Sequence, residues 1–320
     1  MDAPTELARE VVAGGALVDP AWRRAFEEVP RELFVPSYHA VTPDGADQEW
    51  RSRDHPDARV RERWWRGLYQ DVPLATRMRD GALTSSSSQP SLMARMLEAL
   101  QVVDGNRVLE VGTGPGWNAA LLAHRLGETN VTTVDVDPEI TRSAREHLAA
   151  AGYHPAVITA DGARGCPEHA PYDRLIATCS LPRVPLPWLA QCRTGALILA
   201  PFATGLIALR VSDDTHATGR FLATPAYFVP LRGDVPPRAS IPVSDTGVPL
   251  DARRSDSFQF LLALVGGEIP ARWAYEIWRD EGRPARERYG VTVADGEQWV
   301  WLDHTDGPHT WLVRSPEDGS

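Results

Sequence analysis

Short apolar segments alternate with helical patterns through the middle of the chain, and this alternation constrains the fold more than any other feature. Such alternation predicts parallel strands connected by helices that cover both faces of the sheet. Two further apolar runs, 206–211 and 219–229, predict a hairpin added to that sheet. The sequence therefore predicts an α/β fold with a doubly wound, mostly parallel sheet of seven strands. The first five are expected at 107–111, 131–135, 156–159, 174–178 and 196–201.

The charge and residue usage exclude several classes of protein. The chain has 33 basic and 43 acidic residues, a net charge of −10, which disfavours nucleic-acid binding. All its basic residues are arginine, so lysine Schiff-base and P-loop lysine chemistry are not available. Its three cysteines are not spaced as CxxC, and we expect no disulfide framework and no metal site. No apolar run approaches the length of a membrane span, and the polar N-terminus lacks a signal pattern, so we expect a cytoplasmic protein.

A glycine-rich loop follows the first predicted parallel strand, and a helix follows the loop. Its sequence is Glu110-Val111-Gly112-Thr113-Gly114-Pro115-Gly116. Closely spaced glycines let the backbone turn tightly and approach a ligand. Trp117 replaces the third glycine of a dinucleotide-binding loop, and the carboxylate of Glu110 would repel phosphates but attract ammonium and sulfonium groups. We therefore expect S-adenosylmethionine to bind at Glu110, Gly112, Thr113, Gly114 and Gly116.

Acidic residues at the ends of the next two strands strengthen this prediction. Asp135 ends the second strand, beside Val136, where its carboxylate can accept hydrogen bonds from both ribose hydroxyls. Asp161 and Gly162 follow the third strand, where the carboxylate can accept a hydrogen bond from the adenine amino group. Each aspartate alone is typical of a helix cap or a turn. Together with the glycine loop, in this order, they predict a nucleoside-binding methyltransferase.

A serine run before the first parallel strand leads into a helical pattern. The run is Thr84-Ser85-Ser86-Ser87-Ser88-Gln89-Pro90. Ser88 is predicted to cap the helix, with a proline in the first turn. The hydroxyls of Ser86, Ser87 and Ser88 beside a helix N-terminus would then form a carboxylate-binding site, the alternative being a flexible linker. Because a carboxylate is already ionised at pH 7, it can attack a sulfonium methyl group without a general base.

Several motifs in order, over roughly residues 68–202, resemble the protein-L-isoaspartate O-methyltransferase family. The resemblance implies a Rossmann-like class I methyltransferase fold, S-adenosylmethionine as cofactor, S-adenosylhomocysteine as product, and methylation of a carboxylate. It places Ser88 at the serine of the family's substrate loop. It also places Glu110, Gly112, Gly114, Asp135, Asp161 and Gly162 at cofactor positions. The motifs are Leu68-Tyr69-Gln70-Asp71-Val72-Pro73-Leu74, Ser86-Ser87-Ser88-Gln89-Pro90, the cofactor motif at 108–122, and Ala170-Pro171-Tyr172-Asp173.

The chain also departs from the repair enzymes of this family, which are shorter and carry threonine and isoleucine at the positions of Ser86 and Ser87. The serine run and the segments Tyr-Gly-Val-Thr-Val and Trp-Val-Trp-Leu-Asp resemble an actinobacterial branch associated with ATP-grasp (graspetide) or lanthipeptide maturation. That resemblance implies methylation of an ordinary aspartate in a ribosomally made peptide, followed by cyclisation of the ester to an aspartimide. The alternatives are a repair enzyme acting on isoaspartyl residues of damaged proteins, and a non-catalytic recognition subunit that binds the cofactor.

The length of 320 residues predicts about two domains. We expect an N-terminal helical, substrate-side region at 1–83, a cofactor-binding core at 84–230 and a C-terminal extension at 231–320 that recognises the substrate. The extension would begin with a linker, 231–255, and contain a hairpin with an Asp-Gly turn. The N-terminal region carries a basic cluster that predicts a solvated helical face, with a binding patch as the alternative. The cluster consists of Arg51, Arg53, Arg59, Arg61, Arg63 and Arg66.

Overall fold

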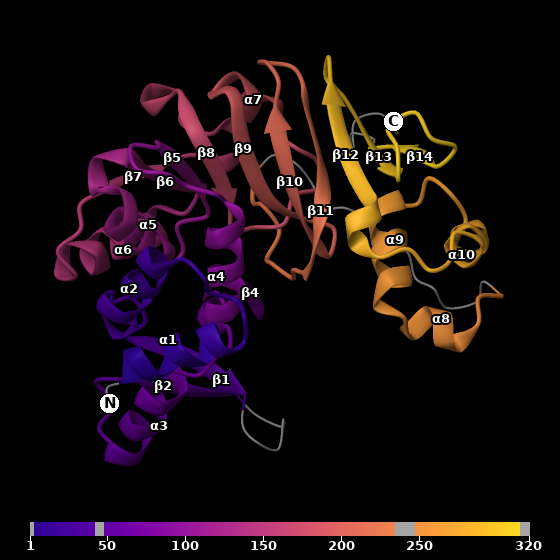
Figure 1. The fold of residues 1–320 in the computed structure, drawn as a ribbon. Coiled ribbons are helices and arrows are strands. Elements are labelled where there is room, and N and C mark those ends of the chain that lie inside the picture. Colours follow the sequence, from indigo (N-terminus) through magenta and orange to yellow (C-terminus); the bar gives the residue numbers. More distant parts are fainter. Residues whose placement is uncertain (1–2, 42–47, 234–246, 314–320) are drawn as a thin grey trace. The chain divides into compact units, whose positions relative to one another are not determined.

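The computed structural model describes residues 3–41, 48–233 and 247–313. The chain divides into two compact units, Met1–Asp161 and Gly162–Ser320 (Figure 1). Among the helices of the described ranges, none is both long enough and apolar enough to cross a bilayer. Most of the predicted linker, residues 234–246, lies outside the described residues.

The first unit begins with helices and a small sheet and ends with alternating strands and helices. Its helices are α1 (Ala3–Ala13), α2 (Pro20–Glu28), η1 (Arg31–Leu33), α3 (Ala58–Leu68), α4 (Pro90–Ala99), α5 (Trp117–Leu126), η2 (Glu128–Asn130) and α6 (Pro138–Ala150). Its strands are β1 (Ser37–Val41), β2 (Gln48–Ser52), β3 (Leu74–Arg79), β4 (Ala82–Ser87), β5 (Val108–Val111), β6 (Val131–Asp135) and β7 (Ala156–Thr159).

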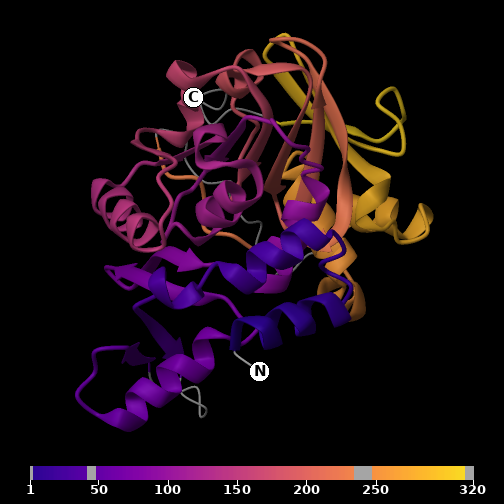
Figure 2. The same cartoon turned by 60° about the vertical axis from the view of Figure 1, so that its left-hand side comes forward.

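The two N-terminal helices, α1 and α2, lie side by side (Figures 1 and 2). Helix α2 begins as its sequence predicts: the Asp19 carboxylate accepts a hydrogen bond from the amide of Ala21, and Pro20 occupies the first turn. Its buried face carries Trp22 and Phe26, and the Phe26 ring packs edge-on against Trp117 of α5 at 5.3 Å. This packing anchors the N-terminal region to the helix that follows the glycine loop.

The four-stranded sheet β2-β1-β3-β4 is not predicted by the sequence pattern. Its strands are antiparallel, and β4 is built from the serine run, with Ser87 opposite Leu74 and Ser86 opposite Ala75 of β3. Serines are poor strand formers by themselves, so this strand depends on its pairing with β3. The serine run is therefore an ordered strand, and the flexible linker considered for it is excluded.

Strands β5, β6 and β7 are parallel and lie in that order, as predicted. The observed bounds of β6 and β7 coincide with the predicted ranges, and β5 begins one residue later than predicted. Every residue of β5 and β6 is buried, including the polar residues Glu110, Thr132 and Thr133, as is typical of parallel strands that are covered on both faces.

The second unit combines a strand-rich half with three helices near its end. Its helices are η3 (Gly162–Arg164), η4 (Pro167–His169), α7 (Leu186–Ala190), α8 (Leu250–Arg254), α9 (Asp256–Val265), α10 (Ala271–Asp280) and η5 (Arg286–Arg288). Its strands are β8 (Tyr172–Ala177), β9 (Cys192–Phe202), β10 (Gly205–Val211), β11 (Ala217–Pro225), β12 (Tyr289–Ala294), β13 (Glu297–Leu302) and β14 (Thr310–Leu312).

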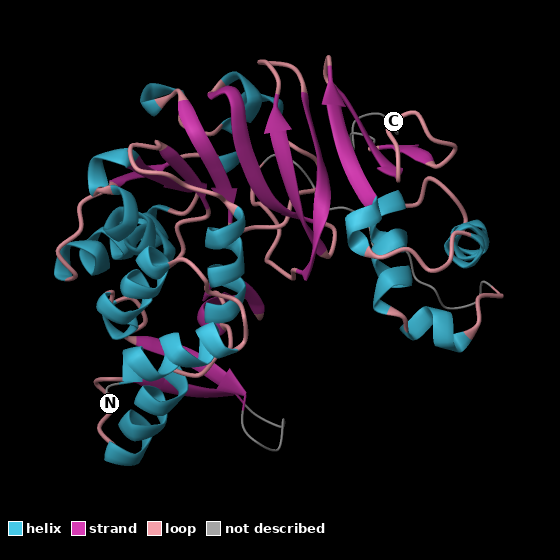
Figure 3. Cartoon of the chain, viewed as in Figure 1, coloured by secondary structure: helices cyan, strands magenta, loops and turns pink. Residues whose placement is uncertain are grey.

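The strands of the second unit lie in the order β14-β13-β12-β11-β10-β9-β8 (Figure 3). Strands β8 and β9 are parallel, and the others are antiparallel to their neighbours. The predicted hairpins are β10–β11 and β12–β13, and Asp295 and Gly296 in the second turn both have positive φ, as a two-residue hairpin turn requires. The seven strands predicted for the core are β5 to β11. The C-terminal hairpin continues the row beyond them, because β12 pairs with β11.

The basic cluster of the N-terminal region is neutralised locally. Arg51 and Arg63 both form ion pairs with Glu49, and Arg66 pairs with Glu62 one turn away on α3. Arg61 donates hydrogen bonds to two backbone carbonyls. These contacts agree with a solvated face rather than with a patch of free positive charge.

A fully buried carboxylate, Glu110, lies in strand β5. It accepts hydrogen bonds from Asn118 Nδ2 at 2.7 Å and from Thr133 Oγ1 at 2.6 Å. Burial raises the pKa of Glu110 to about 7, although both hydrogen bonds favour the ionised form. The folded chain thus holds a proton on Glu110 at pH values where the unfolded chain has lost it.

We predict that Glu110→Gln removes a pH-dependent loss of stability. A raised carboxyl pKa lowers the stability of the folded state as the pH rises from about 4.5 to about 7, by on the order of 3 kcal/mol in total. The amide of Gln can keep both bonds, because the Thr133 hydroxyl can accept a hydrogen bond and donate onward to Thr113. Thermal unfolding of the ligand-free protein should therefore give the variant a higher Tm than the wild type at pH 8 and a similar Tm at pH 4. An equal difference at both pH values would contradict the prediction.

Candidate active site

The glycine loop has the backbone conformation that its sequence predicts. Gly112, Gly114 and Gly116 have φ values of 101°, 52° and 93°, a region that other residues rarely adopt. The amide of Gly112 donates to the carbonyl of Val134 in β6 at 2.8 Å, which fixes the loop at the carboxyl end of two parallel strands. A side chain at Gly116 would lie 3.4 Å from Leu148 of α6, so this glycine allows the loop to lie close to that helix.

The serine strand β4 passes directly over the glycine loop. A Cβ atom at Gly114 would lie 3.4 Å from the Ser86 carbonyl oxygen and 3.8 Å from Ser85 Oγ. The serine strand thus lies within van der Waals distance of Gly114. Two motifs that are about 25 residues apart in the sequence, the serine run and the glycine loop, therefore form one site in the first unit.

Beneath the loop, buried acceptor and hydroxyl groups form a network. The Thr113 and Thr133 hydroxyls are 2.7 Å apart, and Thr133 also bonds Glu110. Asn118, at the start of α5, uses its amide nitrogen on Glu110, while its Oδ1 is buried with no hydrogen-bond partner. This end of the loop thus offers acceptors to a ligand that carries donors or positive charge.

The predicted ribose and adenine residues follow β6 and β7. Asp135 is buried, and its carboxylate accepts hydrogen bonds from the amides of Gly114 and Asp137 at 3.3 and 3.2 Å. The next residue, Val136, is 37% exposed, and an apolar side chain in this position can cover a ligand. Asp161 ends the first unit; the preceding amide of Ala160 donates to the Asp135 carbonyl, so the ends of β6 and β7 meet at one edge.

Gly162 begins the second unit, where it is buried as the first residue of η3. Its carbonyl accepts a hydrogen bond from the Trp188 indole at 2.8 Å. Within its unit this glycine is therefore part of the packing of η3 against α7, and its predicted contact with adenine stays a prediction.

The serine side chains divide between the two faces of β4, because successive residues of a strand point in opposite directions. Ser85 and Ser87 are buried, whereas Ser86 and Ser88 are partly exposed. Within the described ranges, the hydroxyls of Ser86 and Ser88 form no hydrogen bond to the protein. They are the members of the run that can bind a substrate.

The prediction that Ser88 caps helix α4 is wrong. Helix α4 begins at Pro90 after Gln89, without a side-chain cap of its own. Its N-terminus instead receives a carboxylate from another part of the chain: Asp71 accepts hydrogen bonds from the Ser91 amide at 2.8 Å and from Gln89 Nε2 at 3.1 Å. The chain's own carboxylate thus occupies the position that we expected a substrate carboxylate to use.

Arg31 is the residue of this site that the sequence analysis missed. It is fully buried in η1, and its guanidinium bonds the Ser87 hydroxyl and the Ser88 carbonyl, both at 3.1 Å. The buried hydroxyl of Ser87, predicted to contact substrate, is instead an acceptor for this arginine. Nothing local in the sequence distinguishes Arg31 from a surface arginine, since its partners are more than 35 residues away.

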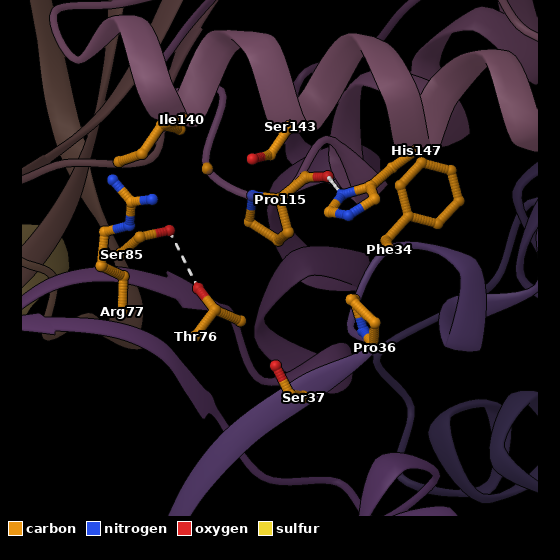
Figure 4. A pocket seen from close by; sticks show the side chains of 11 residues that line it. Phe34, Pro36, Ser37, Thr76, Arg77, Ser85, Pro115, Ile140, Ser143 and His147 are labelled. Atoms are coloured by element: carbon orange, nitrogen blue, oxygen red, sulfur yellow. Dashed lines mark hydrogen bonds between the residues drawn. The ribbon is translucent and has the colours of Figure 1, made fainter. Parts of the chain in front are cut away.

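A cavity of about 170 Å³ lies beside the two motifs, on the Ser85 side of β4 (Figure 4). Thr76 and Ser85 point toward one another across its wall and share a hydrogen bond of 2.9 Å, and His147 bonds the Pro115 carbonyl. The wall also contains Arg77, which pairs with Glu139. The remaining lining residues are Phe34, Pro36, Ser37, Gly114, Ile140 and Ser143.

The residues of the first unit fit S-adenosylmethionine better than a phosphate-containing nucleotide. The side-chain oxygens beneath and beside the loop are acceptors: the carboxylates of Glu110 and Asp135 and Asn118 Oδ1. Acceptors suit an ammonium group, a sulfonium group and ribose hydroxyls, whereas phosphates need donors.

Comparison with known proteins identifies the family. The sequence pattern of the family described as "Protein-L-isoaspartate(D-aspartate) O-methyltransferase (PCMT)" matches residues 58–234. Protein-L-isoaspartate O-methyltransferase 2 of Pelobacter propionicus is 35% identical over 70% of this chain and 88% of its own length. Protein-L-isoaspartate O-methyltransferase 1 of an Anaeromyxobacter species is 36% identical over 71% of this chain and 95% of its own length.

Solved structures show the same fold. One structure, named protein-L-isoaspartate O-methyltransferase, aligns with a TM-score of 0.63 at 19% identity and covers 96% of this chain and 98% of its own. A second, a protein of that kind from Plasmodium falciparum in complex with S-adenosyl-L-homocysteine, aligns with a TM-score of 0.53 at 13% identity and covers 72% of this chain and 99% of its own. The fold is therefore the Rossmann-like class I methyltransferase fold that the sequence predicts.

The acceptor-lined glycine loop, the serine strand beside it and the match over more than half of the chain lead to the same conclusion. The chain belongs to the protein-L-isoaspartate O-methyltransferase family and is an S-adenosylmethionine-dependent carboxyl O-methyltransferase.

Proposed function

We propose that this chain transfers a methyl group to the side-chain carboxylate of an isoaspartyl residue in a polypeptide. The observation that carries the proposal is the contact of β4 with the glycine loop. It places the Ser86 carbonyl oxygen and the Ser85 hydroxyl beside Gly114 of the loop that would hold the methyl donor, and the chain continues from there to Ser88. The relatives at about 35% identity are named for the same reaction and match along most of their own length.

Bound S-adenosylmethionine would supply an activated methyl group on a sulfonium. Glu110, Gly112, Thr113, Gly114 and Gly116 would hold its charged end, while Asp135, Val136, Asp161 and Gly162 would hold its nucleoside. In the transfer, the carboxylate oxygen forms a bond to the methyl carbon as the bond from that carbon to sulfur breaks. The negative and positive charges cancel, and no proton moves, so the site needs no general base.

The chain's own residues would contribute binding, orientation and exclusion of water. Ser88 would donate its hydroxyl hydrogen to one carboxylate oxygen and leave the other oxygen free to react. Ser86, two residues earlier on the same face, would contact the same group. Ser87 would not contact the substrate, because its hydroxyl is buried against Arg31.

The second candidate is methylation of an ordinary aspartate in a ribosomally made peptide of the graspetide or lanthipeptide kind. The methyl ester would then be attacked by the next backbone amide nitrogen, releasing methanol and closing an aspartimide. The serine at position 86 favours this candidate, since it differs from the family's usual threonine. The length of the chain does not favour it, because a structure named for isoaspartyl methylation aligns over 96% of this chain. A substrate-recognition role for residues 231–320 is part of the proposal under either candidate.

One experiment separates the candidates. Two synthetic peptides of identical sequence, one with isoaspartate and one with aspartate, are incubated with the protein and S-adenosylmethionine and followed by mass spectrometry. We expect a gain of one methyl group on the isoaspartyl peptide only. Methylation of the aspartyl form, or of a cross-linked precursor peptide with later loss of methanol, would support the second candidate. Absence of transfer to every peptide would support the non-catalytic recognition subunit.

We predict that Ser88→Ala weakens methyl transfer without weakening cofactor binding. Loss of one hydrogen bond to a charged carboxylate should lower kcat/KM for the peptide by about ten- to hundredfold. The dissociation constant of S-adenosylmethionine, measured by calorimetry, should stay within about twofold. The control is Ser52→Ala, which removes a hydroxyl from β2, at the other end of the same sheet, and should leave transfer nearly unchanged. Equal losses in the two variants would contradict the role of Ser88.

We predict that Asp135→Ala weakens cofactor binding. Loss of hydrogen bonds from two ribose hydroxyls to a carboxylate should raise the dissociation constant by about ten- to hundredfold. The control is Asp137→Ala, which removes the N-cap of α6 but leaves the Asp135 carboxylate in place. If calorimetry gave the two variants the same constant, the ribose would have to bind elsewhere.

A further inference from the structure

We propose that Arg31 is a positioning residue for methyl transfer, which acts by holding the Ser86–Ser88 segment against the glycine loop. This inference rests on the proposed function for its effect on the rate, but the contacts of Arg31 can be tested without any substrate. The residue lies in η1, outside the range that matches the family pattern.

The guanidinium of Arg31 joins two segments that lie far apart in the sequence. Its Nη1 atom donates to the Leu68 carbonyl at 2.7 Å and to the Gln70 carbonyl at 3.4 Å. Its Nη2 atom donates to the Ser87 hydroxyl and to the Ser88 carbonyl, both at 3.1 Å. The planar group thus connects the segment after α3 to the end of β4.

The same guanidinium also contacts the helix that follows the glycine loop. It lies 5.1 Å from the centre of the Trp117 ring, over the first residue of α5. One rigid side chain therefore contacts both the substrate strand and the helix of the cofactor loop. An arginine suits this role because its donors have a fixed fork geometry, whereas a lysine offers a single point charge.

Asp71 holds the next part of the chain from the other side. Its carboxylate accepts hydrogen bonds from Gln89 and from the Ser91 amide. Ser88 therefore lies between two anchors: its own carbonyl is held by Arg31, and the next side chain is held by Asp71. Anchors on both sides leave the Ser88 hydroxyl free while fixing the backbone that carries it.

A buried cation of this kind is costly unless it is well bonded. Arg31 has no exposed surface, and burial lowers its pKa to about 10, so it stays charged at pH 7. Its hydrogen-bond acceptors are neutral carbonyls and one hydroxyl rather than a carboxylate. An apolar residue of similar volume could give the folded state equal stability. The charged guanidinium therefore contributes mainly by fixing the positions of the groups that it bonds.

The test compares Arg31→Met with Arg145→Met. Arg145, on α6, also donates to a backbone carbonyl, that of Val157 at 2.7 Å, but it does not touch the serine strand. Arg31→Lys serves as the conservative variant. Steady-state kinetics with an isoaspartyl peptide are measured below the Tm of every variant, together with hydrogen exchange of the amides of residues 86–91 in the absence of substrate.

We expect Arg31→Met to lower kcat at least about tenfold, with the KM for S-adenosylmethionine within about twofold of the wild type. Arg31→Lys should recover part of that loss. Arg145→Met should lower the Tm without lowering kcat. Exchange at residues 86–91 should become faster in Arg31→Met only. If Arg31→Met does not fold, Ser87→Ala, which removes one acceptor of the guanidinium, is compared with Ser52→Ala in the same way.

Unchanged exchange at residues 86–91, or a loss of rate that Arg145→Met shares, would overturn the positioning role. A wild-type protein that does not methylate the isoaspartyl peptide would overturn the proposed function instead. In that case the exchange data alone would still decide whether Arg31 holds the serine strand.

Discussion

The close approach of a strand to the glycine loop is the constraint on which the active site of this protein depends. Strand β4 lies beside Gly114, where an added Cβ would lie 3.4 Å from the Ser86 carbonyl oxygen, a van der Waals contact. The backbone of the loop is what requires a glycine at this position, since φ is 52° there and residues with a side chain rarely adopt that value. The small N-terminal sheet holds this strand in place, since β4 pairs with β3 and β3 pairs with β1. The glycine loop and the serine strand are thus brought together by packing rather than by a shared sequence motif.

Charged groups buried on either side of this contact keep it in place. Glu110 lies under the glycine loop and Arg31 under the serine strand, and both are fully buried. Each is bonded to neutral hydroxyls, amides or carbonyls instead of to the other, so neither charge is cancelled by a direct ion pair. Burying a charge in this way lowers the free energy of unfolding or adds little to it. What the protein gains is a fixed backbone at Gly112–Gly116 and at Ser86–Ser88.

The parts of the fold that the sequence predicted are those specified by local patterns. Strands β6 and β7 were predicted at their observed bounds because they are short segments rich in β-branched residues between helical patterns, and α2 because Asp19 and Pro20 are adjacent. Strands β1 to β4 were not predicted, because a run of serines becomes a strand only through its partner. The capping of α4 was predicted wrongly for a related reason: Asp71, the carboxylate that caps it, is 20 residues away. Contacts between residues that are far apart in the sequence produce no periodic pattern of residues from which they could be predicted.

The same long-range contacts change how the unusual serines should be interpreted. At position 87 the family's usual isoleucine is a serine, and in this structure its hydroxyl is an acceptor for Arg31. An isoleucine there would leave the guanidinium with one acceptor fewer, so this departure is explained by the packing of the strand and implies nothing about the substrate. At position 86 the side chain points to the opposite face of β4, and serine in place of threonine removes only one methyl group. Of these two departures, only the one at Ser86 can therefore bear on the proposed substrate, because the smaller side chain leaves more room there.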